Sequence, residues 1–136
     1  MRQRGFTYLG LLFAIALLGI GLVAASEVWV STARHQRMAQ LDWAGGQIVT
    51  AIGSYYDASP GSAKVYPTSL QELLEDRRYL TTRRHLRQVY PNAFTGQVDW
   101  TLVLTPDGRI RGVQAALPPE LGLPPREYTH VPVVAR

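Results

Sequence analysis

The 136-residue sequence contains no cysteine. This absence excludes a disulfide scaffold and a zinc site built from thiolates. The three histidines, His35, His85 and His130, are scattered without metal-ligand spacing, so we interpret each as an ordinary polar residue. No nucleophile, base and metal set converges in the sequence. The sequence therefore predicts no enzyme activity, no metal site and no cofactor.

Charge is missing from a long stretch near the N-terminus. No Asp, Glu, Lys or Arg occurs between Arg4 and Glu27, and most residues between them are apolar. About 20 apolar residues in a helix span a bilayer core of about 30 Å. The sequence therefore predicts a transmembrane helix over residues 6–26. Arg2 and Arg4 favour a cytoplasmic N-terminus, which places the rest of the chain in the periplasm of a Gram-negative cell.

Two simpler interpretations of this segment compete. A secretory signal peptide also starts with basic residues, but its apolar core is usually about 7 to 15 residues long. The run here is longer, although Ala24-Ala25-Ser26 has the small residues of a cleavage site. A plain signal anchor fits the length and the charge. It has no need, however, of the order Arg4-Gly5-Phe6-Thr7 directly before the apolar run.

This junction resembles the class III leader of type IV pilins and type II secretion pseudopilins, in which prepilin peptidase cleaves after the glycine and N-methylates the new first residue. The resemblance implies a leader over residues 1–5, cleavage between Gly5 and Phe6, and methylation of Phe6. The family's fifth mature residue is normally a glutamate for pairing with a neighbouring subunit's terminal amine, but here it is Gly10. Because the tip-located K-type pseudopilin also lacks this glutamate, the resemblance favours a minor or initiating subunit.

The sequence predicts that the first helix continues to about Tyr56. Residues 27–56 contain no proline, and apolar or small residues recur every three or four positions, as one helix face requires. This segment is the expected periplasmic half of the helix. The predicted buried face consists of Met38, Leu41, Gly45, Ile48, Ile52 and Tyr55. Four polar residues fall elsewhere on the helix: Arg34, Arg37, Gln40 and Gln47.

A small globular head is expected over residues 57–116. Thr68 with Gln71, or Ser69 with Glu72, has capping-box spacing and predicts a short helix to about Asp76. This helix buries three leucines: Leu70, Leu73 and Leu74. Alternating strand formers predict strands over 98–104 and 109–115, joined by the turn Thr105-Pro106-Asp107-Gly108.

The head also carries a resemblance. Its motif Pro91-x-x-Phe94-Thr95-Gly96, followed by Asp99-Trp100, resembles the core of the G-type pseudopilin group. The implied fold class is α+β and pilin-like: a long N-terminal helix, its first half transmembrane, packed on a small antiparallel sheet. The G-type protein holds calcium near its C-terminus through aspartates. Here the only acidic residues after Asp99 are Asp107, Glu120 and Glu127, so no such site is expected.

The C-terminal segment 117–136 is rich in proline. Paired prolines favour an extended chain and cannot donate hydrogen bonds to a sheet. This composition predicts a strap or a mobile tail, and a strap in this place would stabilise the head without calcium.

Five arginines lie close together in the sequence and form the one candidate binding patch. They are Arg77, Arg78, Arg83, Arg84 and Arg87, with His85 among them. Such a cluster can neutralise several phosphates of a nucleic acid. A solvated face, or an interface with acidic patches of neighbouring subunits, is the favoured explanation, because the chain lacks the strong positive charge of a dedicated nucleic-acid binder.

Taken together, these patterns and the resemblance imply a minor structural subunit of a type II secretion pseudopilus, which assembles through its N-terminal helix to drive protein export. Its expected partners are other pseudopilins, prepilin peptidase, the inner-membrane assembly platform and membrane lipid, and nucleic acid is not among them. The expected location is the inner membrane, with a single pass and a periplasmic head. Two alternatives stay open: a minor type IV pilin that binds DNA or a surface through the arginines, and an unrelated signal-anchored periplasmic protein.

Overall fold

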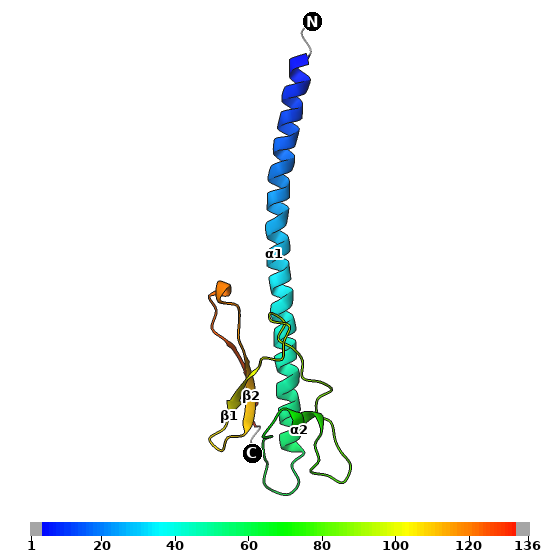
Figure 1. The fold of residues 1–136 in the computed structure, drawn as a ribbon, viewed down its shortest axis with the longest axis vertical. Helices are drawn as coiled ribbons and strands as arrows, with labels where there is room; N and C mark the ends of the chain where they lie inside the picture. Colours follow the sequence, from blue (N-terminus) through cyan, green and yellow to red (C-terminus); the bar gives the residue numbers. More distant parts are fainter. Residues whose placement is uncertain (1–3, 133–136) are drawn as a thin grey trace. The chain divides into compact units, whose positions relative to one another are not determined.

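The computed structural model describes the backbone of residues 4–132 and, within it, the side chains of residues 7–20 and 30–132. The fold is α+β, with a long helix and a small antiparallel sheet (Figure 1). By its contacts the chain forms two units, Met1–Arg37 and Met38–Arg136. The elements in chain order are α1 (Arg4–Asp57), α2 (Gln71–Leu74), β1 (Thr101–Leu104), β2 (Ile110–Ala115), the 3-10 helix η1 (Pro119–Leu121) and β3 (Arg126–Thr129).

The long helix predicted over residues 6–56 is confirmed, because α1 begins two residues earlier, at Arg4, and ends one residue later, at Asp57. Within the unit Met38–Arg136, its predicted face is the buried one, because Leu41, Ile48 and Ile52 are fully buried. The residues predicted to lie off this face, such as Gln40 and Gln47, are exposed. The second half of α1 is therefore the spine on which the head is built.

The head sheet has the order β1-β2-β3, and both pairings are antiparallel. The predicted turn joins β1 to β2: the amide of Gly108 donates to the carbonyl of Thr105 at 2.9 Å, and Gly108 has the positive φ of 74° that glycine tolerates. The second strand matches its predicted range closely. The first is shorter than predicted and begins at Thr101.

The C-terminal segment, predicted as a strap or a mobile tail, contains a strand, β3, that the sequence analysis did not predict. Residues 126–129 instead pair with β2, and Tyr128 lies opposite Val113. Pro119 begins η1, and no proline lies within the strand, so the prolines cost the sheet no hydrogen bond. Residues 126–129 are thus a structural part of the head.

A contact between β3 and α1 depends on Gly45. A Cβ atom added there would lie 2.5 Å from Cδ2 of the Tyr128 ring, closer than real Cβ atoms approach. The Tyr128 hydroxyl donates to Asp42 at 2.6 Å, and Arg126 donates to both oxygens of the same carboxylate at 3.1 and 3.2 Å. These bonds fix β3 on the helix, and the absent side chain of Gly45 makes room for the ring.

The second helix is shorter than predicted and is stabilised differently. It covers only Gln71–Leu74, and no side chain caps its N-terminus. Instead, Thr68 pairs with Glu72, four residues on, so neither predicted capping box forms. Leu73 is fully buried, and Leu70 and Leu74 pack partly buried against the core, as expected.

The core joins α1, α2 and the sheet in one cluster. Its indole, Trp100, is buried and donates from Nε1 to the carbonyl of Tyr90 at 2.7 Å. The buried apolar residues are Leu41, Ala44, Ile48, Ala51, Ile52, Tyr55, Leu73, Leu86, Trp100, Ile110, Val113 and Ala115.

Candidate functional site

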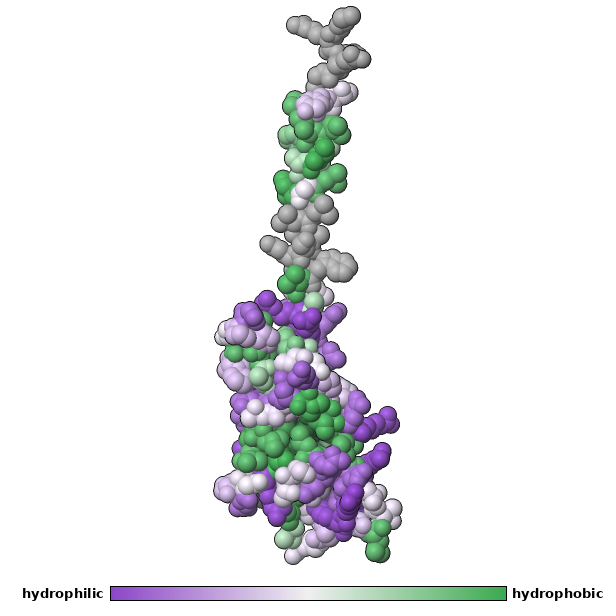
Figure 2. All heavy atoms as spheres, viewed as in Figure 1, coloured by the Kyte–Doolittle hydropathy of each residue, from purple (hydrophilic) through white to green (hydrophobic). Residues whose placement is uncertain are grey.

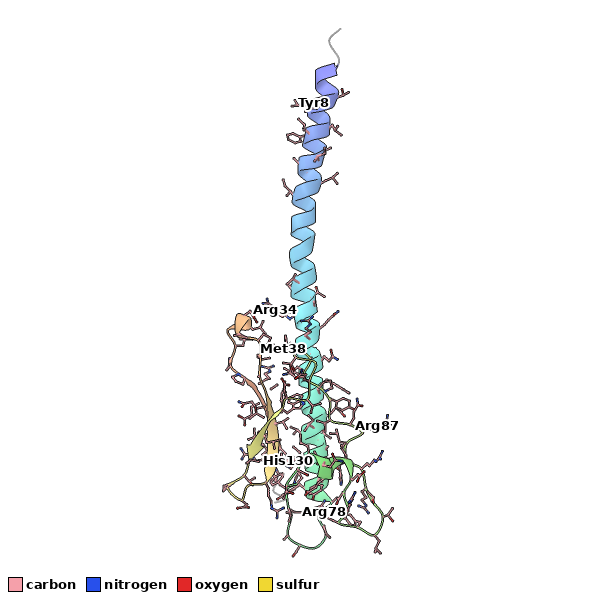
Figure 3. All side chains as sticks on the ribbon, in the orientation of Figure 1. Tyr8, Arg34, Met38, Arg78, Arg87 and His130 are labelled. Atoms are coloured by element: carbon pink, nitrogen blue, oxygen red, sulfur yellow. The ribbon has the colours of Figure 1, made fainter. Side chains whose placement is uncertain are left out.

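The described part of the unit Met1–Arg37 has an unusual surface. Its large apolar side chains over residues 8–20 are all exposed, with fractions between 47% and 69%. At 3.6 residues per turn they cover every side of the helix rather than one stripe. Figure 2 colours most of this segment as hydrophobic, and Figure 3 shows side chains projecting around Tyr8. They are Tyr8, Leu9, Leu11, Leu12, Phe13, Ile15, Leu17, Leu18 and Ile20.

Within the part of the chain whose side chains are described, no helix combines the length and the apolar character needed to cross a bilayer. The predicted transmembrane segment 6–26 extends into residues 21–29, whose side chains lie outside the described residues. The side chain of Phe6, the predicted methylation site, also lies outside them, and of the predicted leader and its cleavage site the structure describes only the backbone of Arg4, Gly5 and Phe6.

Gly10, the position of the missing assembly glutamate, lies in the described helix. A Cβ atom built there meets no atom within 4 Å. Nothing in the described chain therefore requires a glycine at this position for packing. A larger residue fits the fold of the isolated chain equally well.

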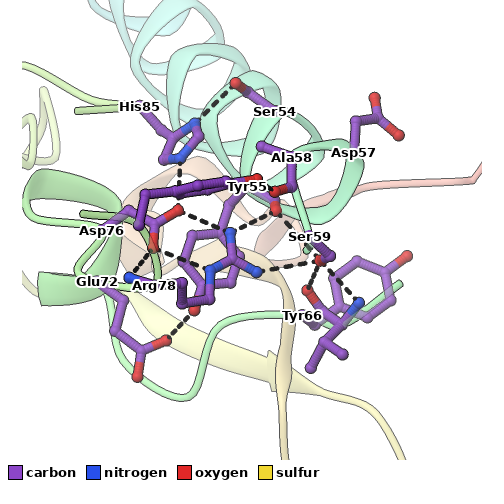
Figure 4. A network of polar contacts seen from close by, with 12 residues as sticks. Ser54, Tyr55, Asp57, Ala58, Ser59, Tyr66, Glu72, Asp76, Arg78 and His85 are labelled. Carbon is purple, nitrogen blue, oxygen red and sulfur yellow. Dashed lines mark hydrogen bonds and ion pairs between the residues drawn. The ribbon is translucent and has the colours of Figure 1, made fainter. Parts of the chain in front are cut away.

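The arginine cluster does not form one surface, because Arg78 turns inward. Its guanidinium donates to both oxygens of Asp76 at 2.9 and 2.7 Å, and to the backbone carbonyl of Tyr55 at 2.8 Å (Figure 4). It also lies 3.5 Å from the centroid of the Tyr55 ring and donates to Ser59. Tyr55 is in the last turn of α1, so Arg78 satisfies a carbonyl that the helix itself leaves free.

Asp76 is the centre of this network. Its side chain is fully buried, and its carboxylate accepts from Arg78 and, at 3.1 Å, from Nε2 of His85. With Nε2 carrying the proton, Nδ1 of His85 accepts from the hydroxyl of Ser54 at 2.8 Å. The network therefore ties α1 to the loop after α2 through a single buried carboxylate.

The electrostatics follow from these contacts. The hydrogen bonds from Arg78 hold the pKa of Asp76 far below its usual range, although burial opposes this. Burial and the hydrogen bond to Glu72 raise the pKa of the Tyr55 hydroxyl to about 12, so it stays protonated and donates at 2.7 Å. Both groups thus keep the protonation states that their bonds require at neutral pH.

The other four arginines lie outside the head core. Arg77 pairs with Glu75 at 2.7 Å, and its side chain is 81% exposed. Arg83 is exposed with its guanidinium 4.1 Å from the centroid of the Tyr79 ring. Arg84 and Arg87 are exposed, and no ion pair is recorded for either among the described residues. Arg78 therefore has a structural role inside the head, whereas the other four arginines of the cluster lie on its surface.

Sequence reasoning missed the contacts of Asp42 with Arg126 and Tyr128. The partners lie more than 80 positions apart in the sequence, and no local pattern connects them. Hydrogen bonds from Arg126 lower the pKa of Asp42 below its usual value, although burial opposes them. Among the described residues, no three His, Asp or Glu side chains come together in a way that could hold a metal ion.

Comparison of the chain with protein-family models, with curated proteins and with solved structures finds no match.

Proposed function

We propose that this chain is a minor or initiating subunit of a type II secretion pseudopilus. In this proposal it has a pilin-like fold, is inserted in the inner membrane through residues 6–26, and carries its head in the periplasm. Prepilin peptidase cleaves between Gly5 and Phe6 and methylates Phe6. The chain then joins other pseudopilins at the assembly platform, and its helix leaves the lipid as the filament grows and pushes cargo outward.

One observation carries this proposal: α1 has two halves of opposite character. Its described N-terminal residues expose apolar side chains on every side, whereas its second half buries one apolar face in the core of a folded head. A helix that is apolar all round needs lipid or other helices around it. The uncharged sequence between Arg4 and Glu27 supports the proposal that lipid surrounds this part of the helix before assembly. In the filament, neighbouring helices would surround it instead.

Gly10 supports the minor or initiating role within this proposal. A carboxylate in a bilayer costs on the order of 3 kcal/mol unless it has a partner. A subunit without one inserts without that cost, but it offers nothing to the terminal amine of a neighbour. It therefore suits a place in the filament where that pairing is not used.

The rival function, a type IV pilin that binds DNA through its arginines, has weaker support. Arg78 is bound to Asp76 inside the head, and Arg77 is paired with Glu75. The exposed cations that remain from the cluster are Arg83, Arg84 and Arg87. With three phosphate contacts, the logarithm of the DNA-binding constant would fall with the logarithm of the salt concentration with a slope of only about −2.7. This slope is small for a dedicated DNA-binding surface.

The proposal is tested by asking whether the full chain enters filaments. It is produced in Gram-negative cells that carry a type II secretion system, with and without prepilin peptidase, and sheared filaments are separated from membranes. We expect the chain in the filament fraction only in peptidase-positive cells. Gly5→Val should keep it in the membrane, because a β-branched residue replaces the glycine at the cleavage site.

Gly10→Ala is the matched control, since beyond the helix's own backbone a methyl group at this position meets nothing within 4 Å among the described residues. This variant should enter filaments like the unmodified protein. A chain that stays wholly in the membrane fraction of peptidase-positive cells contradicts the proposal. So does a Gly5→Val variant that enters filaments normally.

A further inference from the structure

A short loop, residues 76–84, follows α2 and projects from the head (Figure 1). We call this loop the finger. Leu80, in its middle, is fully exposed and is the most exposed large apolar residue of the described head. Arg83 and Arg84 follow in the second limb of the finger, and both are exposed. The finger thus combines an uncovered leucine with positive charge.

The finger is held in one shape by bonds at its base and along its length. Asp76 and Arg83 exchange two backbone hydrogen bonds of 2.8 and 3.1 Å, which close the loop. The Tyr79 hydroxyl donates to the carbonyl of Ala58, and the Arg83 guanidinium lies over the Tyr79 ring. These contacts hold Leu80 away from the head core. A preformed loop also loses little conformational entropy when it binds.

The charge around the finger is strongly positive. Residues 75–88 contain five arginines and two acidic residues, so three positive charges are uncompensated. Neither carboxylate neutralises the second limb, because Asp76 is bound to Arg78 inside the head and Glu75 is bound to Arg77. The finger and the residues after it therefore favour an anionic partner.

The finger lies at one end of the head. Its Tyr79 is bonded to Ala58, directly after the end of α1, whereas the chain enters the head at Met38. The 20 residues from Met38 to Ala58 correspond to about 30 Å of helix. Figure 3 shows Met38 and Arg78, at the base of the finger, toward opposite ends of the head. The finger therefore meets whatever the far end of the head meets.

A leucine among arginines matches the surface of an anionic bilayer. Arginines bind lipid phosphates, and each one near such a surface strengthens binding by about fivefold. An apolar side chain enters the boundary between headgroups and acyl chains. The phosphates of a nucleic acid attract arginines as well, but they offer no apolar layer to Leu80. A protein would need a pocket shaped for this leucine, whereas a bilayer needs none.

We propose that the finger docks on an anionic lipid surface facing the far end of the head, with Leu80 below the headgroups and Arg83 and Arg84 on lipid phosphates. The contact is made in trans, to a membrane other than the one that anchors the chain. One leucine and a few arginines bind weakly, so the contact is reversible. An initiating subunit leads its filament, and the finger would then be the part that first touches the facing membrane.

Binding between two sets of vesicles tests this contact. The full chain is reconstituted in dense vesicles of neutral phosphatidylcholine, and the number of outward-facing heads is determined by protease accessibility. Labelled vesicles with equal parts of phosphatidylcholine and phosphatidylglycerol are added and sedimented with them. We expect at least tenfold more retention than of labelled phosphatidylcholine vesicles, and a decrease as salt is raised. Equal retention of the two kinds of vesicle overturns the proposal.

The role of the leucine is tested separately. Leu80→Ser should reduce retention at least threefold, because a hydroxyl replaces the inserted side chain. Val98→Ser is the matched control, since Val98 is also exposed, at 57%, but lies outside the finger. It should leave retention unchanged. Retention that depends on the arginines but not on Leu80 indicates general binding to polyanions such as DNA and overturns the lipid contact.

The role of the charge has its own pair of variants. Arg83→Gln with Arg84→Gln should reduce retention about 25-fold, at about fivefold for each arginine. Arg34→Gln with Arg37→Gln removes the same charge from exposed positions before the head and should change retention less than twofold. Equal losses in the two double variants overturn the assigned role of the finger.

This inference rests on the proposed function for the membrane that the finger meets, which is the inner leaflet of the outer membrane. The vesicle assay needs neither cleavage at Gly5 nor filament assembly. A chain that is processed in cells but retains no anionic vesicles overturns the lipid contact and leaves the proposed function standing. A chain that retains them but stays uncleaved in peptidase-positive cells supports the contact and counts against the proposed function alone.

Discussion

Replacement of Asp76 by asparagine is expected to destabilise the head by about 2–4 kcal/mol, since removing one partner of a buried ion pair is strongly destabilising. The Asp76 side chain is fully buried, and Arg78 and His85 are only 22% and 5% exposed. Asparagine keeps only one of the two acceptor oxygens and none of the charge, so Arg78 and His85 would lose part of the acceptor that they share. For a unit of about 100 residues this corresponds to a fall in Tm of roughly 10–25 °C, measured by tryptophan fluorescence of the full chain in detergent.

Glu75→Gln is the matched control, because it removes the neighbouring carboxylate and its ion pair with Arg77 from an exposed site. Exposed pairs contribute about 0–1 kcal/mol, so Tm should change little. If Asp76→Asn were as stable as Glu75→Gln, the buried network would not hold the head together.

We also expect the stability that Asp76 contributes to depend on pH. The pKa of Asp76 is lowered in the folded state, so its stabilising effect is present above the unfolded pKa of about 4 and is lost as pH falls through the folded value. The stability difference between the unmodified chain and Asp76→Asn should therefore be constant from neutral pH to about pH 5. It should shrink below about pH 4. A difference that persists undiminished in acid would contradict the assigned role of the charge.

The second large effect is expected at Gly45. Alanine there would place its methyl group 2.5 Å from the Tyr128 ring, and the ring cannot move without stretching the bond from its hydroxyl to Asp42. Overpacking of this kind costs about 1–3 kcal/mol, and the lost hydrogen bond to a carboxylate adds to it. The better helix propensity of alanine returns about 1 kcal/mol. We expect a net destabilisation of about 2 kcal/mol in thermal unfolding.

Gly46→Ala provides the control at the next residue, because nothing lies within 4 Å of an added Cβ there. It should stabilise the head by up to about 1 kcal/mol through helix propensity alone. Amide hydrogen exchange should show the difference locally: exchange of the His130 amide, which donates to the Arg111 carbonyl, should accelerate in Gly45→Ala and not in Gly46→Ala. Equal stability of the two variants would contradict the close contact between β3 and α1.

Local patterns were sufficient to predict α1 and the β1–β2 hairpin. Leu41, Ile48 and Ile52 repeat with the helical period, and a helix needs only near neighbours for its bonds. The turn before β2 carries its own chemistry, since proline and glycine favour the backbone angles found there. In these segments the local preference and the tertiary contacts agree.

Strand β3 could not be predicted in the same way. The sequence Arg126-Glu127-Tyr128-Thr129 is short, carries two charges and lies between the pair Pro124-Pro125 and Pro132. Its place in the sheet depends on β2, which is separated from it by the proline-rich residues 116–125, and on the space above Gly45, which is distant in the sequence. The role of Arg78 could not be predicted for a related reason. The sequence does not distinguish the five neighbouring arginines, and only the fold brings Arg78 beside the end of α1 and the buried Asp76.

The most direct test of the central claim is the chemical identity of the N-terminus. The full chain is purified from membranes of cells with and without prepilin peptidase, and its first residues are determined by mass spectrometry. The account predicts N-methylated Phe6 as the first residue in peptidase-positive cells and an uncleaved leader in peptidase-negative cells. A chain that still begins at Met1 when the peptidase is present would contradict it.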